Sequence, residues 1–536
     1  MGLGWGSRVT DQTIDAAALH AELRSGAEIA LIDLRETGAF GKRHILRAVN
    51  IPRSRFELCY RRMIPRCGVP VVLCDAGEGL TGCVVDILTF AGWRNVRVLK
   101  GGIDAWEAAG YPLFSGVNVP SKAFGEFIEA RDGTPHVSAD ELHDMQARGD
   151  NIAVLDSRPF PEFHKMSIPG GVDMPGAELV HRVKTVVTDP ATKVVVNCAG
   201  RTRSIIGAQS LINAGLENEV VALENGTMGW MLAGYDCANE SMAVAAPPGK
   251  ANGRWGRDAA EKVARRFGVG RVLWREVEGW RADPDRTTFL LDVRSREEFL
   301  AGHIPGSQHA PGGQLVQATD EYVGVQNARL VLIDDAGTRA LMTGSWLRQM
   351  GWRDVAVLES DLSYVGLERG EPPCDTYELA LMSVAKISVE DFLKMGSGVP
   401  LVDFSRSLDH RKGHPKGARF AIRSRLPRDL SSILSERWMV FTADDPRLAC
   451  LAAQDMTRAG VHRVKVLDGG NAEWRAVGGE IETGMTDPFS LEEDVFHKPY
   501  DLTLNRAAMQ QYIDWETALM PLVEREGTLT FPSFPD

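Results

Sequence analysis

One stretch of the chain, residues 194–204 with the sequence VVVNCAGRTRS, combines residue types that support thiol chemistry. A short apolar strand delivers Cys198 into a turn that holds a glycine and two arginines, Arg201 and Arg203. We expect a helix to begin near Ser204, so its N-terminus and the two guanidiniums would stabilise a thiolate at Cys198. Such a turn also directs backbone N–H groups at one point and suits an anion. The stretch therefore predicts a nucleophilic cysteine facing an oxyanionic sulfur or phosphorus substrate.

Length and composition narrow the classes of protein that this chain can represent. Its 536 residues predict about three to four domains. The net charge of -12 and the pI near 5.6 argue against a broad nucleic-acid surface. The eight cysteines form no CxxC pair, which argues against a disulfide framework or a structural zinc site. No signal-peptide pattern and no apolar run of about 18 residues is present, so we expect a cytoplasmic protein without a membrane contact or a metal.

The chain repeats one pattern four times, and this pattern predicts the fold. An apolar strand ending in Asp is followed by a turn, a Phe or similar anchor and Gly-His-Ile or a relic of it. A second apolar strand, a loop, an amphipathic helix and a third strand come next. Short apolar strands that alternate with helices predict an α/β fold, with a parallel sheet covered by helices on both faces in each repeat. We place repeat one at residues 1–118, repeat two at 119–245, repeat three at 246–376, repeat four at 377–485 and a tail with one helix at 486–536.

Three of the repeats carry an Asp-x-Arg sequence at the end of the first strand. The pairs are Asp33 with Arg35, Asp156 with Arg158 and Asp292 with Arg294; repeat four keeps Asp403 without the arginine. Three copies of the same pair favour an ion pair that holds the turn over a catalytic role.

The order of these motifs resembles the rhodanese family. The motifs are Asp-x-Arg, Gly-His-Ile-Pro-Gly as at 302–306, an apolar strand, a loop with cysteine, and Gly-Gly-x-x-x-Trp as at 101–106. The resemblance covers about nine tenths of the chain in four tandem copies. It implies a thiosulfate sulfurtransferase whose loop cysteine takes a sulfane sulfur, holds it as a persulfide and passes it to a thiophilic acceptor such as cyanide or a thiol.

Comparing the four loops predicts which repeat is active. Alignment places Asp75, Asp335 and Ala443 at the position of Cys198 in repeats one, three and four. Neither aspartate nor alanine forms a persulfide, so we expect turnover in repeat two alone. Cys74 precedes Asp75, and we expect it to be a buried, inert side chain.

We predict Cys198 as the catalytic residue of sulfur transfer. The candidate substrate-binding residues are Ala199, Gly200, Arg201, Thr202, Arg203 and Ser204. Their backbone N–H groups would hold the persulfide, and the two arginines would orient the donor's oxyanion. Two alternatives on these side chains stay open: Arg203 turns inward to brace the loop, and Thr202 and Ser204 cap the helix.

No metal or organic cofactor is implied. The expected partners are a small sulfur donor and a thiol or cyanide acceptor, with a protein acceptor or a homodimer also compatible with the sequence. A phosphatase is less favoured because only four residues separate Cys198 from Arg203, which gives a small cradle. A non-catalytic scaffold or sulfur-carrier binding protein is the second hypothesis, because three repeats lack the nucleophile.

Overall fold

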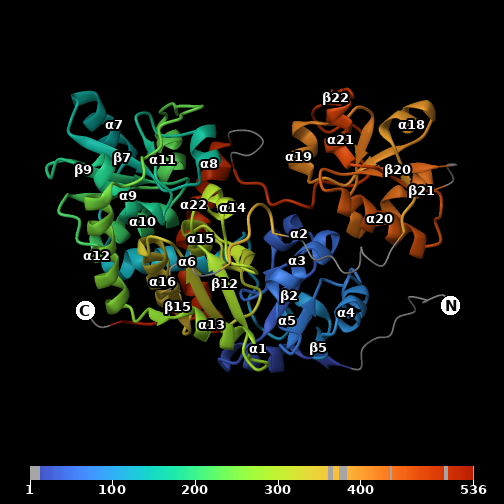
Figure 1. Ribbon diagram of the computed structural model, residues 1–536, viewed down its shortest axis with the longest axis horizontal. Coiled ribbons are helices and arrows are strands. Elements are labelled where there is room, and N and C mark those ends of the chain that lie inside the picture. Colours follow the sequence, from blue (N-terminus) through green and yellow to red (C-terminus); the bar gives the residue numbers. More distant parts are fainter. Residues whose placement is uncertain are drawn as a thin grey trace.

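Each repeat forms a five-stranded parallel sheet in the computed structural model (Figure 1). The structure describes residues 12–359, 366–372, 383–396, 398–434, 438–499 and 505–534. The strand orders are β1-β5-β4-β2-β3, β6-β10-β9-β7-β8, β11-β15-β14-β12-β13 and β16-β21-β20-β17-β19. These are one topology repeated four times, so the predicted α/β fold is confirmed.

The elements of repeats one and two follow the predicted alternation. Repeat one contains β1 (Thr13–Ile14), α1 (Ala16–Arg24), β2 (Ala30–Asp33), α2 (Thr37–Lys42), β3 (Val49–Asn50), α3 (Phe56–Met63), β4 (Val71–Cys74), α4 (Thr81–Phe90), β5 (Val96–Leu99) and α5 (Gly102–Ala108). Repeat two contains α6 (Val119–Asp132), β6 (His136–Val137), α7 (Ala139–Arg148), β7 (Ile152–Asp156), α8 (Phe160–Lys165), β8 (Val172–Asp173), α9 (Glu178–Val186), β9 (Lys193–Asn197), α10 (Thr202–Asn213), β10 (Val220–Leu223) and α11 (Gly226–Ala233).

Repeats three and four keep the same order with small additions. Repeat three contains α12 (Lys250–Arg266), β11 (Gly270–Val272), α13 (Trp274–Arg281), β12 (Thr288–Asp292), α14 (Arg296–Ala301), β13 (Gln308–His309), α15 (Gly312–Gln317), β14 (Arg329–Ile333), α16 (Thr338–Gln349) and β15 (Val355–Leu358). Repeat four contains β16 (Lys386–Ile387), α18 (Val389–Lys394), β17 (Leu401–Asp403), α19 (Ser407–Lys412), β19 (Ala418–Phe420), β20 (Met439–Thr442), α20 (Pro446–Arg458), β21 (Val464–Leu467) and α21 (Gly470–Ala476). An antiparallel pair, β18 (His414–Pro415) and β22 (Ile481–Glu482), is added to repeat four.

The Asp-x-Arg sequences form the ion pairs that the sequence predicts. The Asp33–Arg35, Asp156–Arg158 and Asp292–Arg294 pairs have N–O distances of 2.5, 2.7 and 2.6 Å, and all three are buried. Each arginine also donates to a backbone carbonyl eight residues further on. In repeat four the carboxylate of Asp403 instead meets the Nδ1 atom of His410 at 2.7 Å. These pairs hold the turn after the first strand, so they stabilise the loop rather than react.

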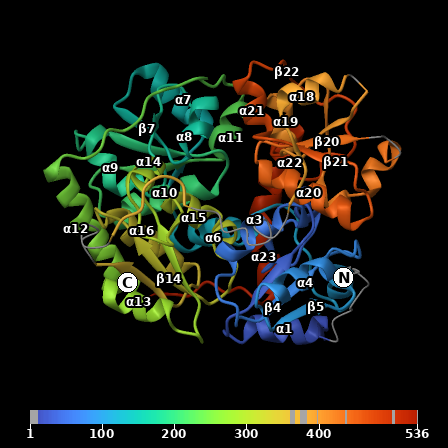
Figure 2. The same cartoon turned by 45° about the vertical axis from the view of Figure 1, so that its right-hand side comes forward.

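The repeats meet around a common centre. Repeats one, two and three share one continuous apolar cluster, and α12 of repeat three packs against α9 of repeat two. Repeat four has its own apolar cluster and joins repeat one through buried charges, where Arg423 donates to Glu57. Figure 2 shows α3, α6, α15 and α23 (Leu519–Glu526) gathered in the middle of the molecule.

The tail contains two helices where the sequence predicted one. The helical segment is interrupted at Ala518, which separates α22 (Arg506–Thr517) from α23. Pro521 explains the break, because a proline ring clashes with the carbonyl four residues earlier, here that of Thr517. Both helices pack against α6, and α22 also contacts α11. The tail therefore docks on the body of the molecule.

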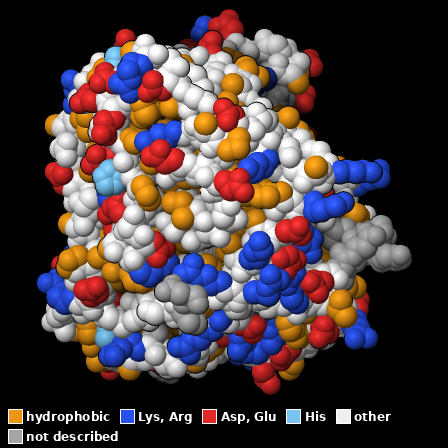
Figure 3. Space-filling model, turned by 90° about the vertical axis from the view of Figure 1, so that its left-hand side faces the viewer, with side chains coloured by type: hydrophobic (Ala, Val, Ile, Leu, Met, Phe, Trp, Pro, Cys, Tyr) orange, Lys and Arg blue, Asp and Glu red, His pale blue; other side chains and the backbone are white. Residues whose placement is uncertain are grey.

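The surface carries mixed charge on the face in Figure 3, where Lys and Arg alternate with Asp and Glu. This pattern agrees with the acidic composition and with the absence of a broad basic face on that side. Among the helices of the described ranges, none has the length and apolar character that a membrane span needs.

Candidate active site

Cys198 lies at the carboxyl end of β9, in the loop that leads into α10. It is 2% exposed, and its Sγ donates to Ser204 Oγ at 3.6 Å. Helix α10 begins at Thr202, two residues earlier than expected, and no side chain caps it. The capping alternative for Thr202 and Ser204 is therefore wrong, because both side chains lie within the first turn. Ser204 Oγ donates instead to the carbonyl of Arg201 at 2.7 Å.

The loop presents backbone donors that the protein leaves without acceptors. Within the described residues, the N–H groups of Ala199, Gly200 and Arg201 make no hydrogen bond. These donors precede the N-terminus of a twelve-residue helix, where partial positive charge accumulates. Together they form the type of cradle that holds an anion at or near the cysteine sulfur.

Strand register identifies the residue that corresponds to Cys198 in each repeat. The aspartates that end β2, β7, β12 and β17 stand opposite Cys74, Asn197, Ile333 and Thr442 on the neighbouring strands of repeats one to four. The next residue is Asp75, Cys198, Asp334 and Ala443, respectively. The predicted equivalent in repeat three, Asp335, is therefore wrong by one residue. The loop of repeat three has one more residue than that of repeat two between the end of the strand and its Ala-Gly sequence, so a match of the two Ala-Gly sequences shifts the register.

Asp75 and Asp334 fill their own loops in the same way. Oδ1 of Asp75 accepts the N–H two residues on, and Oδ2 accepts the N–H five residues on, at 3.0 and 2.8 Å. Asp334 makes the same two bonds, at 3.2 and 2.9 Å, and Arg339 is also bound to its carboxylate. Each carboxylate therefore uses a backbone donor, equivalent to the N–H of Gly200, that the Cys198 loop keeps available. Cys74 is fully buried, and burial raises the pKa of its thiol well above the ordinary value, as expected of an inert cysteine.

Both arginines of the active loop are bound to carboxylates. Arg201 Nε donates to Glu126 at 2.8 Å, and its Nη2 is bound to Glu126 and Glu129, all on α6. Arg203 pairs with Glu162 of α8 at 2.8 Å. The pKa of Glu162 would be raised by burial, but Arg203 more than offsets this and lowers it to about 2. These contacts favour a bracing role; the orientation of the donor by either arginine stays a prediction.

The tail helix α22 supplies the other side of the loop. Thr202 Oγ1 donates to Glu516, whose second oxygen is buried without a partner in the described residues. The ammonium of Lys122 lies 3.4 Å from Glu516 and 5.7 Å from the ring centre of Tyr512. Burial alone would lower the pKa of Lys122, but Glu516 offsets it and raises the pKa. The tail therefore fixes the start of α10 by a buried charge pair.

Cys198 opens into a cavity of about 690 Å³ where all four repeats and the tail meet. Repeat two contributes the residues of the loop, and α2 and α3 of repeat one face it. Repeat three contributes Gln314 and Tyr322, repeat four contributes Arg406, and the tail contributes Tyr512. In the parts of the chain that the structure describes, no group of three or more His, Cys, Asp and Glu side chains is arranged to hold a metal ion.

Several residues at this site were not identified from the sequence. They are Lys122, Glu126, Glu129, Glu162, Tyr512 and Glu516, which come from α6, α8 and the tail. Glu126 and Glu129 carry a detectable signal, because two acids three residues apart on a helix face the same way. Glu516 lies 314 residues from its partner Thr202, and no local pattern reports such a contact.

Comparison with known proteins now places the chain in a family. The rhodanese-like domain family matches residues 15–109, 138–233 and 274–365, which is more than half of the chain. The chain belongs to the rhodanese family. Repeat four lies outside the matched segments, although its rhodanese-like sheet has the strand order of the other three.

Individual relatives include other rhodaneses. A crystal structure of a thiosulfate sulfurtransferase from Pseudomonas aeruginosa is 41% identical, with a TM-score of 0.93, over 98% of this chain and all of that one. A thiosulfate sulfurtransferase from Azotobacter vinelandii is 28% identical over 36% of this chain and 77% of its own length. A putative sulfur carrier protein from Bacillus subtilis is 31% identical over 14% of this chain and 40% of its own length. These matches support a rhodanese-type sulfurtransferase.

Proposed function

We propose that this rhodanese moves a sulfane sulfur from thiosulfate or a related donor, through a persulfide on Cys198, to a thiol or cyanide. One observation carries the proposal: of the four equivalent positions, only that of repeat two combines a thiol with backbone donors that the protein leaves available. In repeats one and three an aspartate carboxylate accepts the N–H group that corresponds to that of Gly200.

In the proposed reaction, the Cys198 thiolate attacks the outer sulfur of thiosulfate. The bond between the two donor sulfurs breaks, sulfite leaves with its electron pair, and the outer sulfur stays on Cys198 as a persulfide. The N–H groups of Ala199, Gly200 and Arg201 stabilise the terminal sulfur of this anion. A thiol or cyanide then attacks that sulfur, and Cys198 returns to the thiolate.

The other three repeats complete the cavity rather than react. Repeats one, three and four each contribute residues to the wall around Cys198, and the tail braces the loop through Glu516. This arrangement explains why domains without a nucleophile are retained beside an active one. A scaffold role therefore belongs to those three domains, while repeat two carries the catalysis.

Thiosulfate and cyanide test the proposal directly through the formation of thiocyanate. Wild type is expected to turn over and to gain one sulfur atom on the Cys198 peptide by mass spectrometry. Cys198→Ala is expected to lose both, whereas Cys59→Ala, which changes a second cysteine on the same cavity wall, keeps both. If wild type makes no thiocyanate and gains no sulfur, the proposal is wrong. Hydrolysis of an aryl phosphate that depends on Cys198 would favour the phosphatase instead.

A further inference from the structure

The cavity around Cys198 is larger than thiosulfate requires. Its volume of about 690 Å³ falls within the range of sites that enclose organic ligands. Apolar side chains, among them Ile51, Met63 and Phe496, line part of the wall. A substrate with an organic body therefore fits the space in front of the cysteine.

Arg55 of repeat one and Arg406 of repeat four stand on this wall without an ion-pair partner in the described residues. Arg55 and Arg406 line the cavity, and within the described residues neither side chain forms a hydrogen bond or an ion pair. Burial lowers the pKa of Arg55 and the charge of Arg406 lowers it further, while Cys59, Asp494 and Glu36 offset only part of this effect. Arg201 and Arg203, which also line the cavity, each form an ion pair with a carboxylate, whereas Arg55 and Arg406 form none with the described residues.

The acidic groups near this pair are committed to other partners or stand apart from it. Both oxygens of Glu36 accept serine hydroxyls, from Ser54 and Ser424. Asp494 accepts the backbone N–H of Ser407 through Oδ2, and its Oδ1 is buried without a hydrogen-bond partner in the described residues. Asp494 raises the pKa of Arg55, but the two side chains form no ion pair in the part of the chain that the structure describes. An anion that enters the cavity would therefore gain charge-assisted hydrogen bonds from two guanidiniums that have no ion-pair partner among the described residues.

We propose that Arg55 and Arg406 bind a carboxylate of a small organic persulfide, R–S–SH, whose sulfur end lies at Cys198. This inference rests on the proposed sulfur transfer at that cysteine. It names the substrate class as a low-molecular-weight thiol that carries carboxylates away from its sulfur. It also gives repeats one and four a role in substrate recognition, because each supplies one guanidinium.

The transfer needs no oxidant or reductant. The Cys198 thiolate attacks the terminal sulfur of R–S–SH, the S–S bond of the donor breaks, and R–S⁻ leaves with the electron pair. The terminal sulfur keeps its proton and becomes part of Cys198–S–SH. The reverse steps pass sulfur from Cys198 to R–S⁻, so the same carboxylate site serves the thiol as acceptor.

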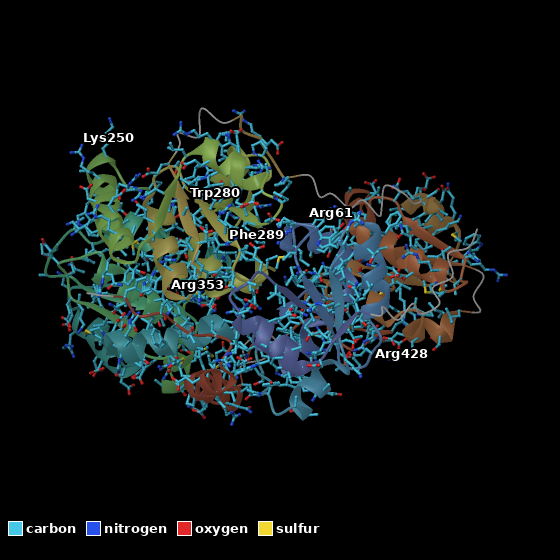
Figure 4. All side chains as sticks on the ribbon, turned by 90° about the horizontal axis from the view of Figure 1, so that it is seen from below. Arg61, Lys250, Trp280, Phe289, Arg353 and Arg428 are labelled. Carbon is cyan, nitrogen blue, oxygen red and sulfur yellow. The ribbon has the colours of Figure 1, made fainter. Side chains whose placement is uncertain are left out.

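Glutathione persulfide, its diethyl ester and thiosulfate are suitable donors for the test, because only the first carries free carboxylates on an organic body. The measured quantity is kcat/KM for loading Cys198. We expect Arg55→Gln and Arg406→Gln each to lower it about tenfold or more for glutathione persulfide. Both variants should stay near wild type with the ester and with thiosulfate. Arg428→Gln is the matched control, since this arginine lies on the margin of repeat four, is 70% exposed and does not line the cavity (Figure 4).

A binding measurement separates recognition from chemistry. S-methylglutathione cannot transfer sulfur, so calorimetry with the full chain reports recognition of its carboxylates alone. Binding that weakens in Arg55→Gln and in Arg406→Gln, and not in Arg428→Gln, supports the inference. Equal binding and equal loading in all three variants overturn it while leaving the sulfur transfer intact. A failure of every donor to load Cys198 would overturn the proposed function itself and the inference with it.

Discussion

Replacing Glu57 with glutamine tests how repeats one and four are held together around the cavity. Arg423 of repeat four donates to both oxygens of Glu57 at 2.7 Å, and Arg53 donates to it at 3.1 Å. All three side chains are buried. Burial alone would raise the pKa of Glu57, but Arg423 and Arg53 more than offset it and lower the pKa to about 2.

The size and sign of the effect follow from this pKa. A fall from the ordinary 4.5 to about 2 corresponds to about 3.4 kcal/mol of folding free energy at neutral pH. Because the folded state binds this proton more weakly than the unfolded state, the contribution is complete above about pH 4.5 and is lost as the pH falls toward 2. About 1.4 kcal/mol should remain at pH 3, so about 2 kcal/mol is lost between neutral pH and pH 3.

Urea unfolding of Glu57→Gln and wild type at pH 7 and pH 3 measures both quantities. At neutral pH we expect a loss of about 3 to 5 kcal/mol, because glutamine removes the more deeply buried of the two carboxylates, Glu57 and Asp455, that Arg53 and Arg423 share. The difference between variant and wild type should shrink by about 2 kcal/mol at pH 3. Glu107→Gln is the control, since Glu107 forms an exposed pair with Arg43 and should change little at either pH. A difference that is the same at both pH values, or absent at pH 7, would refute the reasoning.

Three further predictions concern single residues. Asp173 is buried with one oxygen unpartnered in the described residues, and its pKa is raised to about 7, mainly by burial and further by the charge of Asp156. Asp173→Asn should therefore stabilise the chain increasingly as pH rises from about 4 to 7, and equal melting temperatures of the two proteins at pH 8 would contradict this. Glu516→Ala should cost about 3 to 5 kcal/mol in urea unfolding and slow the loading of Cys198, because Lys122 loses its buried partner and Thr202 loses its hydrogen-bond acceptor. Glu516→Gln should retain more activity, and unchanged loading in both variants would argue against a bracing role of the tail. Asp75→Cys should gain no persulfide from thiosulfate, because Glu78 stands where repeat two has Arg201. A sulfur atom added to the peptide around position 75 would show that a cysteine at this position is sufficient for activity.

The sequence by itself determined the repeating unit and the residue that reacts. Continuous apolar strands followed by Asp-x-Arg are local patterns, and each is set by contacts within a few residues or with the neighbouring strand. For the same reason the loop of Cys198 was recognised from its cysteine, its glycine and its arginines. Comparison of the four loops also identified Asp75 and Ala443, although it chose Asp335 in place of Asp334, because loops of unequal conformation do not preserve the register of the strands.

Only the tertiary structure decided what surrounds the cysteine. The partners of Arg201 come from α6, Glu516 comes from the far end of the chain, and Arg55 and Arg406 come from two different repeats. Such contacts depend on how the repeats pack, and packing buries charges in pairs that no local spacing records. The cysteine could therefore be found in the sequence, whereas the cavity, its braced loop and the two arginines on its wall come together only where four repeats and the tail meet.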